Sequence, residues 1–157
     1  MQKSVLSETV RNKNIVITGG SSGIGESAAY LLAKAGAHVI LIARTLNDLE
    51  KVQSKINTFS GKVSIYSCDL TDIEAINKTT KQILKDHGFV DILINNAGRS
   101  IRRSVSESLD RFHDFERTMD INYFGPVKLV LAFLPSMLKR KKGHIINISS
   151  IGVLANT

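Results

Sequence analysis

A glycine-rich run at residues 18–25, Thr-Gly-Gly-Ser-Ser-Gly-Ile-Gly, carries the clearest chemical signal in this chain. It follows the apolar run 14–17 and precedes residues 26–35, where apolar side chains recur at helical spacing. A glycine-rich turn between strand and helix lets backbone amides approach a pyrophosphate at the helix N-terminus. We therefore expect this run to bind a nucleotide; the alternative is a flexible turn without a ligand.

A second signal is Arg44, which follows the apolar run 38–43. In dinucleotide sites an acidic residue near this position binds the ribose 2′-hydroxyl, whereas an arginine accommodates a 2′-phosphate. Ala43 leaves no carboxylate to repel that phosphate, and the guanidinium of Arg44 offers two parallel donors. This pattern favours NADP(H); the alternative is a surface arginine that begins the next helix.

Polar side chains also follow three other apolar runs. Asp69 ends the run at 62–68 and could accept a hydrogen bond from an adenine amino group, or merely cap the next helix. Asn95-Asn96-Ala97-Gly98 ends the run at 90–95, and Ser149-Ser150 ends the run at 144–149. Because ligands bind outside the carboxyl ends of parallel strands, we expect these groups to line one crevice.

Short apolar runs alternate with longer periodic segments along the chain. The expected strands are 14–18, 38–43, 62–68, 90–95 and 144–149, and the expected helices are 23–36, 46–59, 72–87 and about 107–141. This alternation predicts an α/β fold, a doubly wound parallel sheet that is Rossmann-like, with helices on both faces. Gly36 and Gly143 are expected at helix C-termini, and Thr71-Asp72 at a helix start.

Composition limits the remaining possibilities. The 157 residues suit a single domain, 1–157, and the net charge of +7 suits an anionic partner. Aromatic residues make up only 6%, and no basic–aromatic stripe indicates nucleic-acid binding. The most apolar stretch, 127–138, is interrupted by Lys128 and Pro135, so we expect no transmembrane segment. The single Cys68 fits a reducing cytoplasm, and no metal site is expected.

In this order, the motifs resemble the short-chain dehydrogenase/reductase family. The matching elements are the run 18–25, Asp69, 95–98, Asn122 and 147–150. The resemblance implies that the cofactor phosphates and ribose are bound by Gly19, Ser21, Ser22, Gly23, Ile24, Gly25 and Arg44. It assigns the adenine to Asp69 and Leu70, and the ribose and nicotinamide side to Asn95, Ala97 and Gly98.

The resemblance also implies two catalytic residues. Asn122 matches an active-site asparagine that holds a water in a proton relay, and Ser150 matches a serine that binds the reacting oxygen. The family's tyrosine and lysine, four residues apart, should follow that serine, but neither occurs in residues 151–157. Tyr30 and Lys34 have this spacing on the first helix, where we expect packing and surface roles. We therefore expect a C-terminally truncated enzyme, inactive alone and a homo-oligomer when full length.

The segments 96–104, 111–119 and 148–156 resemble bacterial fatty acyl-CoA reductases of this family. Those enzymes reduce a long-chain acyl-CoA thioester to an aldehyde with NADPH, and three arginines could bind the phosphates of coenzyme A: Arg99, Arg102 and Arg103. The alternatives are a basic surface loop, an inactive nucleotide-binding fragment, and an NADP-dependent ketone or alcohol dehydrogenase.

Overall fold

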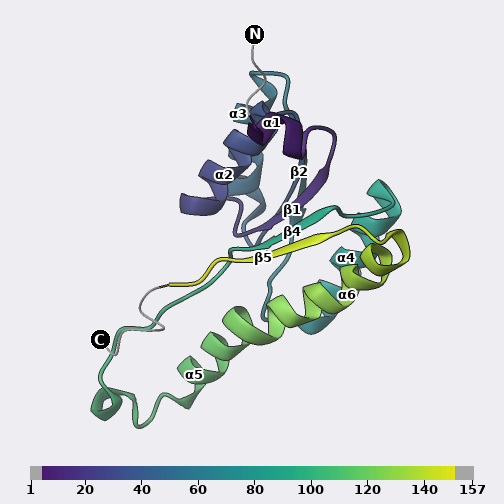
Figure 1. The fold of residues 1–157 in the computed structure, drawn as a ribbon. Helices are drawn as coiled ribbons and strands as arrows, with labels where there is room; N and C mark the ends of the chain where they lie inside the picture. The colour runs from purple at the N-terminus through teal and green to yellow at the C-terminus, as the bar shows by residue number, and fades with distance from the viewer. Residues whose placement is uncertain (1–4, 151–157) are drawn as a thin grey trace.

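Five parallel strands form one sheet in the order β3-β2-β1-β4-β5 (Figure 1). The computed structural model describes residues 5–150. The strands are β1 (Asn14–Thr18), β2 (His38–Ala43), β3 (Lys62–Ser67), β4 (Ile92–Asn95) and β5 (His144–Asn147). The helices are α1 (Val5–Val10), α2 (Gly23–Lys34), α3 (Leu46–Asn57), α4 (Ile73–His87), α5 (Phe112–Met119) and α6 (Gly125–Arg140), with a 3₁₀ turn at Val105–Ser108 and a π turn at Asp120–Phe124. The predicted doubly wound sheet is confirmed.

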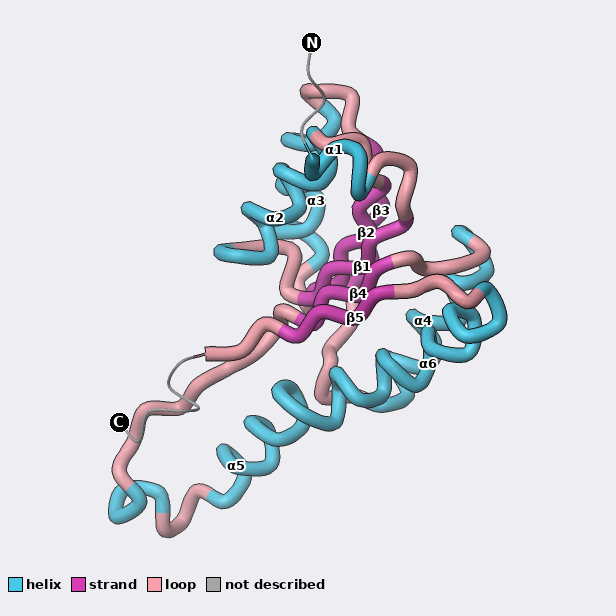
Figure 2. The backbone as a smooth tube through the Cα atoms, in the orientation of Figure 1, coloured by secondary structure: helices cyan, strands magenta, loops and turns pink. Residues whose placement is uncertain are grey.

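Alternate residues of the strands supply two separate cores. Ile15, Ile17 and Leu41 point toward α2 and α3, whereas Val16 and Ile40 point toward the opposite face. That second face is covered by α4 and α6, as Figure 2 shows. Strands buried on both faces are apolar along their whole length, which explains why the sequence marks them so clearly.

The long predicted helix at 107–141 is partly wrong. It begins at Phe112, after the 3₁₀ turn, and a π turn interrupts it between α5 and α6. At its start, Asp114 accepts hydrogen bonds from Arg103 (2.6 Å) and Arg111 (2.8 Å). These side-chain contacts and the π turn leave no periodic signal in the sequence. The short helix α1 was likewise not predicted.

Two of the three predicted helix ends are confirmed. Gly36 has a φ of 92° directly after α2, and the Asp72 carboxylate accepts hydrogen bonds from the amides of Glu74 and Ala75 at the start of α4. At the end of α6, however, Lys141 takes the left-handed conformation with a φ of 52°. Gly143 serves packing instead, because a Cβ there would lie 2.5 Å from the Met137 side chain.

The helix formed by α5, the π turn and α6 bears on the expected absence of a transmembrane segment. One helix, Phe112–Arg140, is long and apolar enough to cross a bilayer by length and composition, because it continues through Lys128 and Pro135. Such a helix also occurs in the cores of soluble proteins, and 22% of its most apolar window is buried here. Leu129 and Phe133 form the buried side, packed against the sheet.

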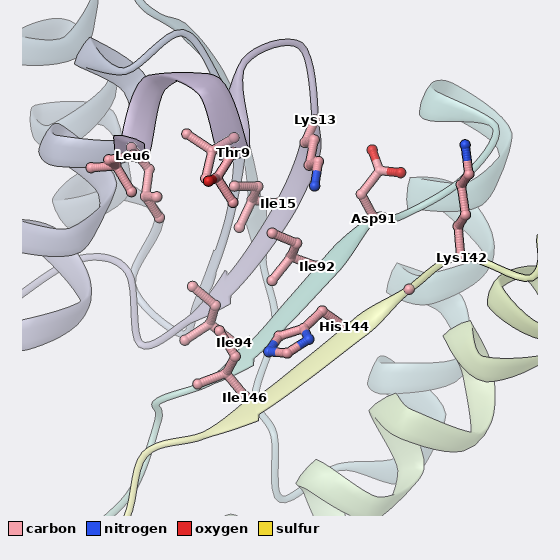
Figure 3. A pocket seen from close by; sticks show the side chains of 13 residues that line it. Leu6, Thr9, Lys13, Ile15, Asp91, Ile92, Ile94, Lys142, His144 and Ile146 are labelled. Atoms are coloured by element: carbon pink, nitrogen blue, oxygen red, sulfur yellow. The ribbon is translucent and has the colours of Figure 1, made fainter. Parts of the chain in front are cut away.

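A cleft of about 530 Å³ lies between α1 and the face of β4 and β5 that α2 and α3 leave uncovered (Figure 3). Its walls are mainly apolar, with Leu6 of α1 on one side and Ile92 and Ile146 of the strands on the other. None of the residues singled out for chemistry lines it. We therefore place the functional site elsewhere, at the other end of the strands.

Two histidines meet near the amino-terminal ends of β2 and β3. The ring of His38 packs edge-on against that of His87 at 4.9 Å, and His38 shares a hydrogen bond with Ser64. Tyr66 donates to Asp86 or to His87, both at 2.8 Å. Burial lowers the pKa of both histidines, and for His38 the nearby positive charges of His87 and Lys62 act in the same direction.

This pair predicts that acid weakens the fold. Because the folded-state pKa values lie below the unfolded value of 6.5, proton uptake favours the unfolded chain. The free energy of unfolding should be fully present above pH 6.5 and fall as the pH drops below it. Urea unfolding at about pH 7.5 and about pH 5.5 measures this. The double variant His38→Gln/His87→Gln should lose a smaller share of its stability over this interval; an equal loss would contradict the assignment.

Candidate functional site

The motif residues gather in a cleft of about 420 Å³ at the carboxyl ends of β1, β2, β3 and β4. This is the topological switch point, where the strand order reverses on either side of β1. Predicted site residues that line it are Gly19, Ser21, Ser22, Arg44, Asp69, Leu70, Ala97, Gly98 and Arg99. Others that line it, but were not predicted, are Ala43, Thr45, Asp48, Cys68, Thr71, Arg117 and Ile121.

The glycine-rich turn has the geometry of a phosphate cradle. Gly19 and Gly23 have φ values of 65° and 56°, in the left-handed region that glycine tolerates best. Ser22 caps α2 in an extended conformation and, within the described residues, makes no side-chain cap hydrogen bond. The first-turn amides of α2 therefore remain available as donors to an anion.

Gly25 fixes how closely the turn and the helix approach each other. A Cβ at this position would lie 2.3 Å from the Gly19 carbonyl oxygen and 2.6 Å from the Asn96 amide nitrogen. The side-chain amide of Asn96 in turn donates a hydrogen bond to the Thr18 carbonyl oxygen at 2.9 Å. Glycine at position 25 is thus required for the turn to fold back against β1 and β4.

Thr18 joins the turn to the end of β4, a role that the sequence reading missed. Its hydroxyl accepts hydrogen bonds from the backbone amides of Asn96 and Ala97, both at 2.9 Å, and donates one to the Ile94 carbonyl oxygen at 3.4 Å. The sequence signal that could have indicated this role is a threonine directly before the first glycine of the turn. These bonds hold the two loops on either side of the cleft at a constant separation.

Asn95 lies inside the sheet and does not line the cleft. It is 4% exposed, and its amide donates to the Asn147 side chain on β5 at 2.9 Å. Its Oδ1 atom is buried without a hydrogen-bond partner among the described residues. Its predicted contact with a ribose remains a prediction, whereas its bond to β5 is a structural role that the sequence did not indicate.

Asp69 is an ionised acceptor on the wall of the cleft. The amide and hydroxyl of Thr71 donate to its Oδ1 atom at 2.9 and 2.8 Å. The hydrogen bond from the Thr71 backbone amide is the main reason that the pKa of Asp69 lies below its usual value. The charges of Arg44 and Arg117 lower it further. Burial raises the pKa of the neighbouring Cys68 thiol, which disfavours the reactive thiolate.

Asn122 lies in the π turn between α5 and α6 and grips the loop that follows β4. Its Oδ1 atom accepts from the Arg99 amide at 3.0 Å, and its Nδ2 atom donates to the Arg99 carbonyl oxygen at 2.7 Å. A Cβ on Gly98 would lie 2.9 Å from that Oδ1 atom, so glycine permits the contact. The structure thus shows Asn122 bonded to the Arg99 backbone, and its expected role of holding a water in a proton relay remains a prediction.

Replacing Asn122 by alanine should release this loop. Two hydrogen bonds of about 0.5–1.5 kcal/mol each would be lost. We expect faster hydrogen exchange at the Arg99 amide and a fall of about 1–2 kcal/mol in the free energy of unfolding. Asn77→Ala is the matched control, because that side-chain amide donates a hydrogen bond to Glu74 within the same helix. Unchanged hydrogen exchange at the Arg99 amide in Asn122→Ala would show that the two hydrogen bonds of Asn122 do not hold the loop.

The three arginines predicted for coenzyme A do not act as one group. Arg99 lines the cleft, whereas Arg103 forms an ion pair with Asp114 at 2.6 Å. Asp114 is also paired with Arg111 at 2.8 Å, and these hydrogen bonds lower the pKa of its carboxyl. Arg102 is exposed on the loop that extends away from the sheet in Figure 1. The charge of Arg103 is therefore used within the fold.

The comparisons with known proteins agree with this geometry. A family model described as "short chain dehydrogenase" matches residues 13–156, which is nearly the whole chain. The chain belongs to the short-chain dehydrogenase family. Its relatives include a fatty acyl-CoA reductase of Acinetobacter baylyi, 59% identical over 98% of this chain and 52% of that protein. Another is a fatty acyl-CoA reductase of Mycobacterium tuberculosis, 46% identical over 91% of this chain and 49% of that protein.

Solved structures of short-chain dehydrogenases share the fold. A metagenomic short-chain oxidoreductase in complex with NADP has a TM-score of 0.85 at 34% identity, over 90% of this chain and 64% of that one. A 3-oxoacyl (acyl-carrier-protein) reductase of Agrobacterium tumefaciens with NADP bound has a TM-score of 0.87 at 30% identity, over 96% and 58%. The chain thus spans about half the length of the curated relatives it matches.

Tyr30 and Lys34 do not form the catalytic pair of a short-chain dehydrogenase. The Tyr30 hydroxyl donates to Glu26 at 2.6 Å, and Lys55 rather than Lys34 lies over its ring. Burial, followed by the effect of Glu26, raises the pKa of Tyr30 to about 12, opposite to what a proton donor needs. Its side chain packs against the core, as expected, and Lys34 is exposed.

Ser150, the predicted catalytic serine, is exposed beyond the carboxyl end of β5. The carboxyl end of β5 is aligned with that of β4, because Asn95 pairs with Asn147. Ser150 therefore lies on the same edge of the sheet as the cleft. The expected absence of a tyrosine and lysine after it concerns residues 151–157, which lie outside the described residues.

Proposed function

We propose that the cleft binds NADP(H) and that the whole protein is an NADPH-dependent oxidoreductase. The observation that carries this proposal is the cradle formed by Gly19, Gly23 and Gly25, with Arg44 at the end of the neighbouring strand. Amides of the cradle suit the pyrophosphate, Arg44 suits a 2′-phosphate, and Asp69 has its Oδ2 atom available for an adenine amino group. Relatives crystallised with NADP support the same ligand.

We propose a long-chain fatty acyl-CoA as the substrate, reduced to a fatty aldehyde. Support comes from two relatives named fatty acyl-CoA reductase and from Arg102, which is exposed and forms no ion pair within residues 5–150. NADPH, when bound, supplies the hydride that reduces the thioester carbonyl carbon. Ser150 would donate a hydrogen bond to the oxygen on which negative charge develops. Asn122 would keep the Arg99 loop beside the nicotinamide end of the site.

The reaction should be measured on the whole protein. With palmitoyl-CoA and NADPH, we expect equal amounts of NADPH oxidised and free coenzyme A thiol released. Turnover of free ketones or alcohols, without thiol release from palmitoyl-CoA, would favour a ketone or alcohol dehydrogenase instead. If the whole protein failed to oxidise NADPH with any carbonyl substrate, a nucleotide-binding role without catalysis would be favoured.

We further propose that the whole protein is a cytoplasmic homo-oligomer that buries the exposed side of α5 and α6. Apolar side chains recur along this side at helical spacing, and they are half or more exposed: Phe112, Phe115, Tyr123 and Leu131. Sedimentation of the whole protein tests this proposal. A monomer with this side exposed would contradict it.

A further inference from the structure

Three arginines converge on the cleft, and one of them, Arg117, has no role in the proposal above. It comes from the last turn of α5, whereas Arg44 follows β2 and Arg99 follows β4. Elsewhere in the described part of the chain, Arg103, Arg111 and Arg140 are held in ion pairs with carboxylates. Arg117 has no such ion pair within residues 5–150, so its charge is available to the cleft.

The helix face that carries Arg117 is fixed against the loop that carries Asp69. Gly125 begins α6 in direct contact with this loop, since a Cβ there would lie 2.4 Å from the Leu70 carbonyl oxygen. Ile121 and Arg117 precede Gly125 by four and eight residues, so all three lie on about the same side of the helix. Both Ile121 and Arg117 line the cleft. The side of the helix that packs on Leu70 therefore continues into the adenine side of the site.

Arg117 and Asp69 both line this part of the cleft. Its charge contributes to lowering the pKa of the Asp69 carboxyl, as that of Arg44 does. Thr71 occupies the Oδ1 atom of Asp69, which leaves the Oδ2 atom for a ligand. A cation on this side favours the ionised, accepting form of that carboxylate and restricts where it points.

We propose that Arg117 is a positioning residue for the adenine half of the cofactor and acts through Asp69. This proposal rests on the proposed cofactor site and adds to it a residue from the helical side of the cleft. Arg44 distinguishes a phosphorylated ribose from an unphosphorylated one, whereas Arg117 strengthens binding of any adenine dinucleotide. The two arginines should therefore differ in what their loss does to the preference for NADPH over NADH.

The test compares dissociation constants for NADPH, NADH and reduced nicotinamide mononucleotide, measured by calorimetry on the whole protein. Arg117→Gln should weaken NADPH and NADH by a similar factor of about five to ten, leaving their ratio within about twofold. Arg117→Lys should recover most of this loss because it keeps the charge. Reduced nicotinamide mononucleotide, which lacks adenine, should bind all variants equally. Arg11→Gln, directly after α1 and outside the cleft, removes a distant charge as a control.

Two outcomes would overturn the proposal. Unchanged binding of both dinucleotides in Arg117→Gln would show that Arg117 does not support the site. A loss confined to NADPH would show a direct contact with the 2′-phosphate instead. Failure of the unmutated protein to bind either dinucleotide would be distinguishable, because it would refute the cofactor site itself.

Discussion

Replacing Gly25 by alanine is expected to abolish cofactor binding. The added Cβ would lie 2.3 Å from the carbonyl oxygen of Gly19, a backbone atom that cannot move without opening the turn. Overpacking of this kind costs about 3 kcal/mol, and it falls on the segment whose amides must converge on the phosphates. We expect the affinity for NADPH to fall more than about a hundredfold, measured by calorimetry, with a clear drop in thermal stability.

Gly23→Ala is the matched control for this prediction. Gly23 belongs to the same turn and has a φ of 56°, but a Cβ there would meet nothing within 4 Å. The cost is then limited to the left-handed backbone, about 1–2 kcal/mol. If Gly23→Ala weakened NADPH binding as much as Gly25→Ala, the turn would need glycine at position 25 for its backbone conformation and not for the close approach of the Gly19 carbonyl oxygen.

Replacing Arg44 by glutamine should remove the preference for NADPH over NADH. A hydrogen bond to a charged group contributes about 1.5–3 kcal/mol, so the NADPH affinity should fall about 10- to 150-fold. NADH lacks the 2′-phosphate, so its affinity should change by less than about twofold. The two dissociation constants, measured on one preparation, give the ratio directly, with Arg11→Gln as the control for net charge. An equal loss for both cofactors would mean that Arg44 does not contact the 2′-phosphate.

The parallel sheet could be predicted mainly from β1 and β2, which are buried on both faces and are therefore almost continuously apolar. The helix boundaries that failed depend on side-chain contacts and on the π turn. Arg103 and Arg111 converge on Asp114 where α5 begins, and the π turn aims Asn122 at the Arg99 backbone. Neither feature leaves a periodic pattern in the sequence.

The candidate site was predictable where its residues end strands, because topology alone places such residues at one edge. Gly19, Arg44, Asp69 and Ala97 all line the cleft for this reason. Arg117 comes instead from the last turn of α5, and its place in the cleft depends on how the following helix α6 packs on Leu70.

The direction in which a strand-end side chain points was also not predictable. Asn95 turns into the sheet toward Asn147, although its neighbours Asn96 and Ala97 bond to Thr18 beside the cleft. Side chains alternate between the two sides of a strand, and the bonding partner on β5 is distant in sequence. A run of site-like residues at one strand end therefore divides into structural and ligand-facing members.

Hydrogen exchange of the whole protein, with and without saturating NADPH, tests the proposed cofactor site most directly. We expect slower exchange in four segments at the carboxyl ends of the strands: 19–26, 44–45, 69–71 and 97–99. The apolar cleft beside α1 should show no comparable change. Protection absent from these four segments, or confined to the cleft beside α1, would contradict the proposal that this edge of the sheet binds the cofactor.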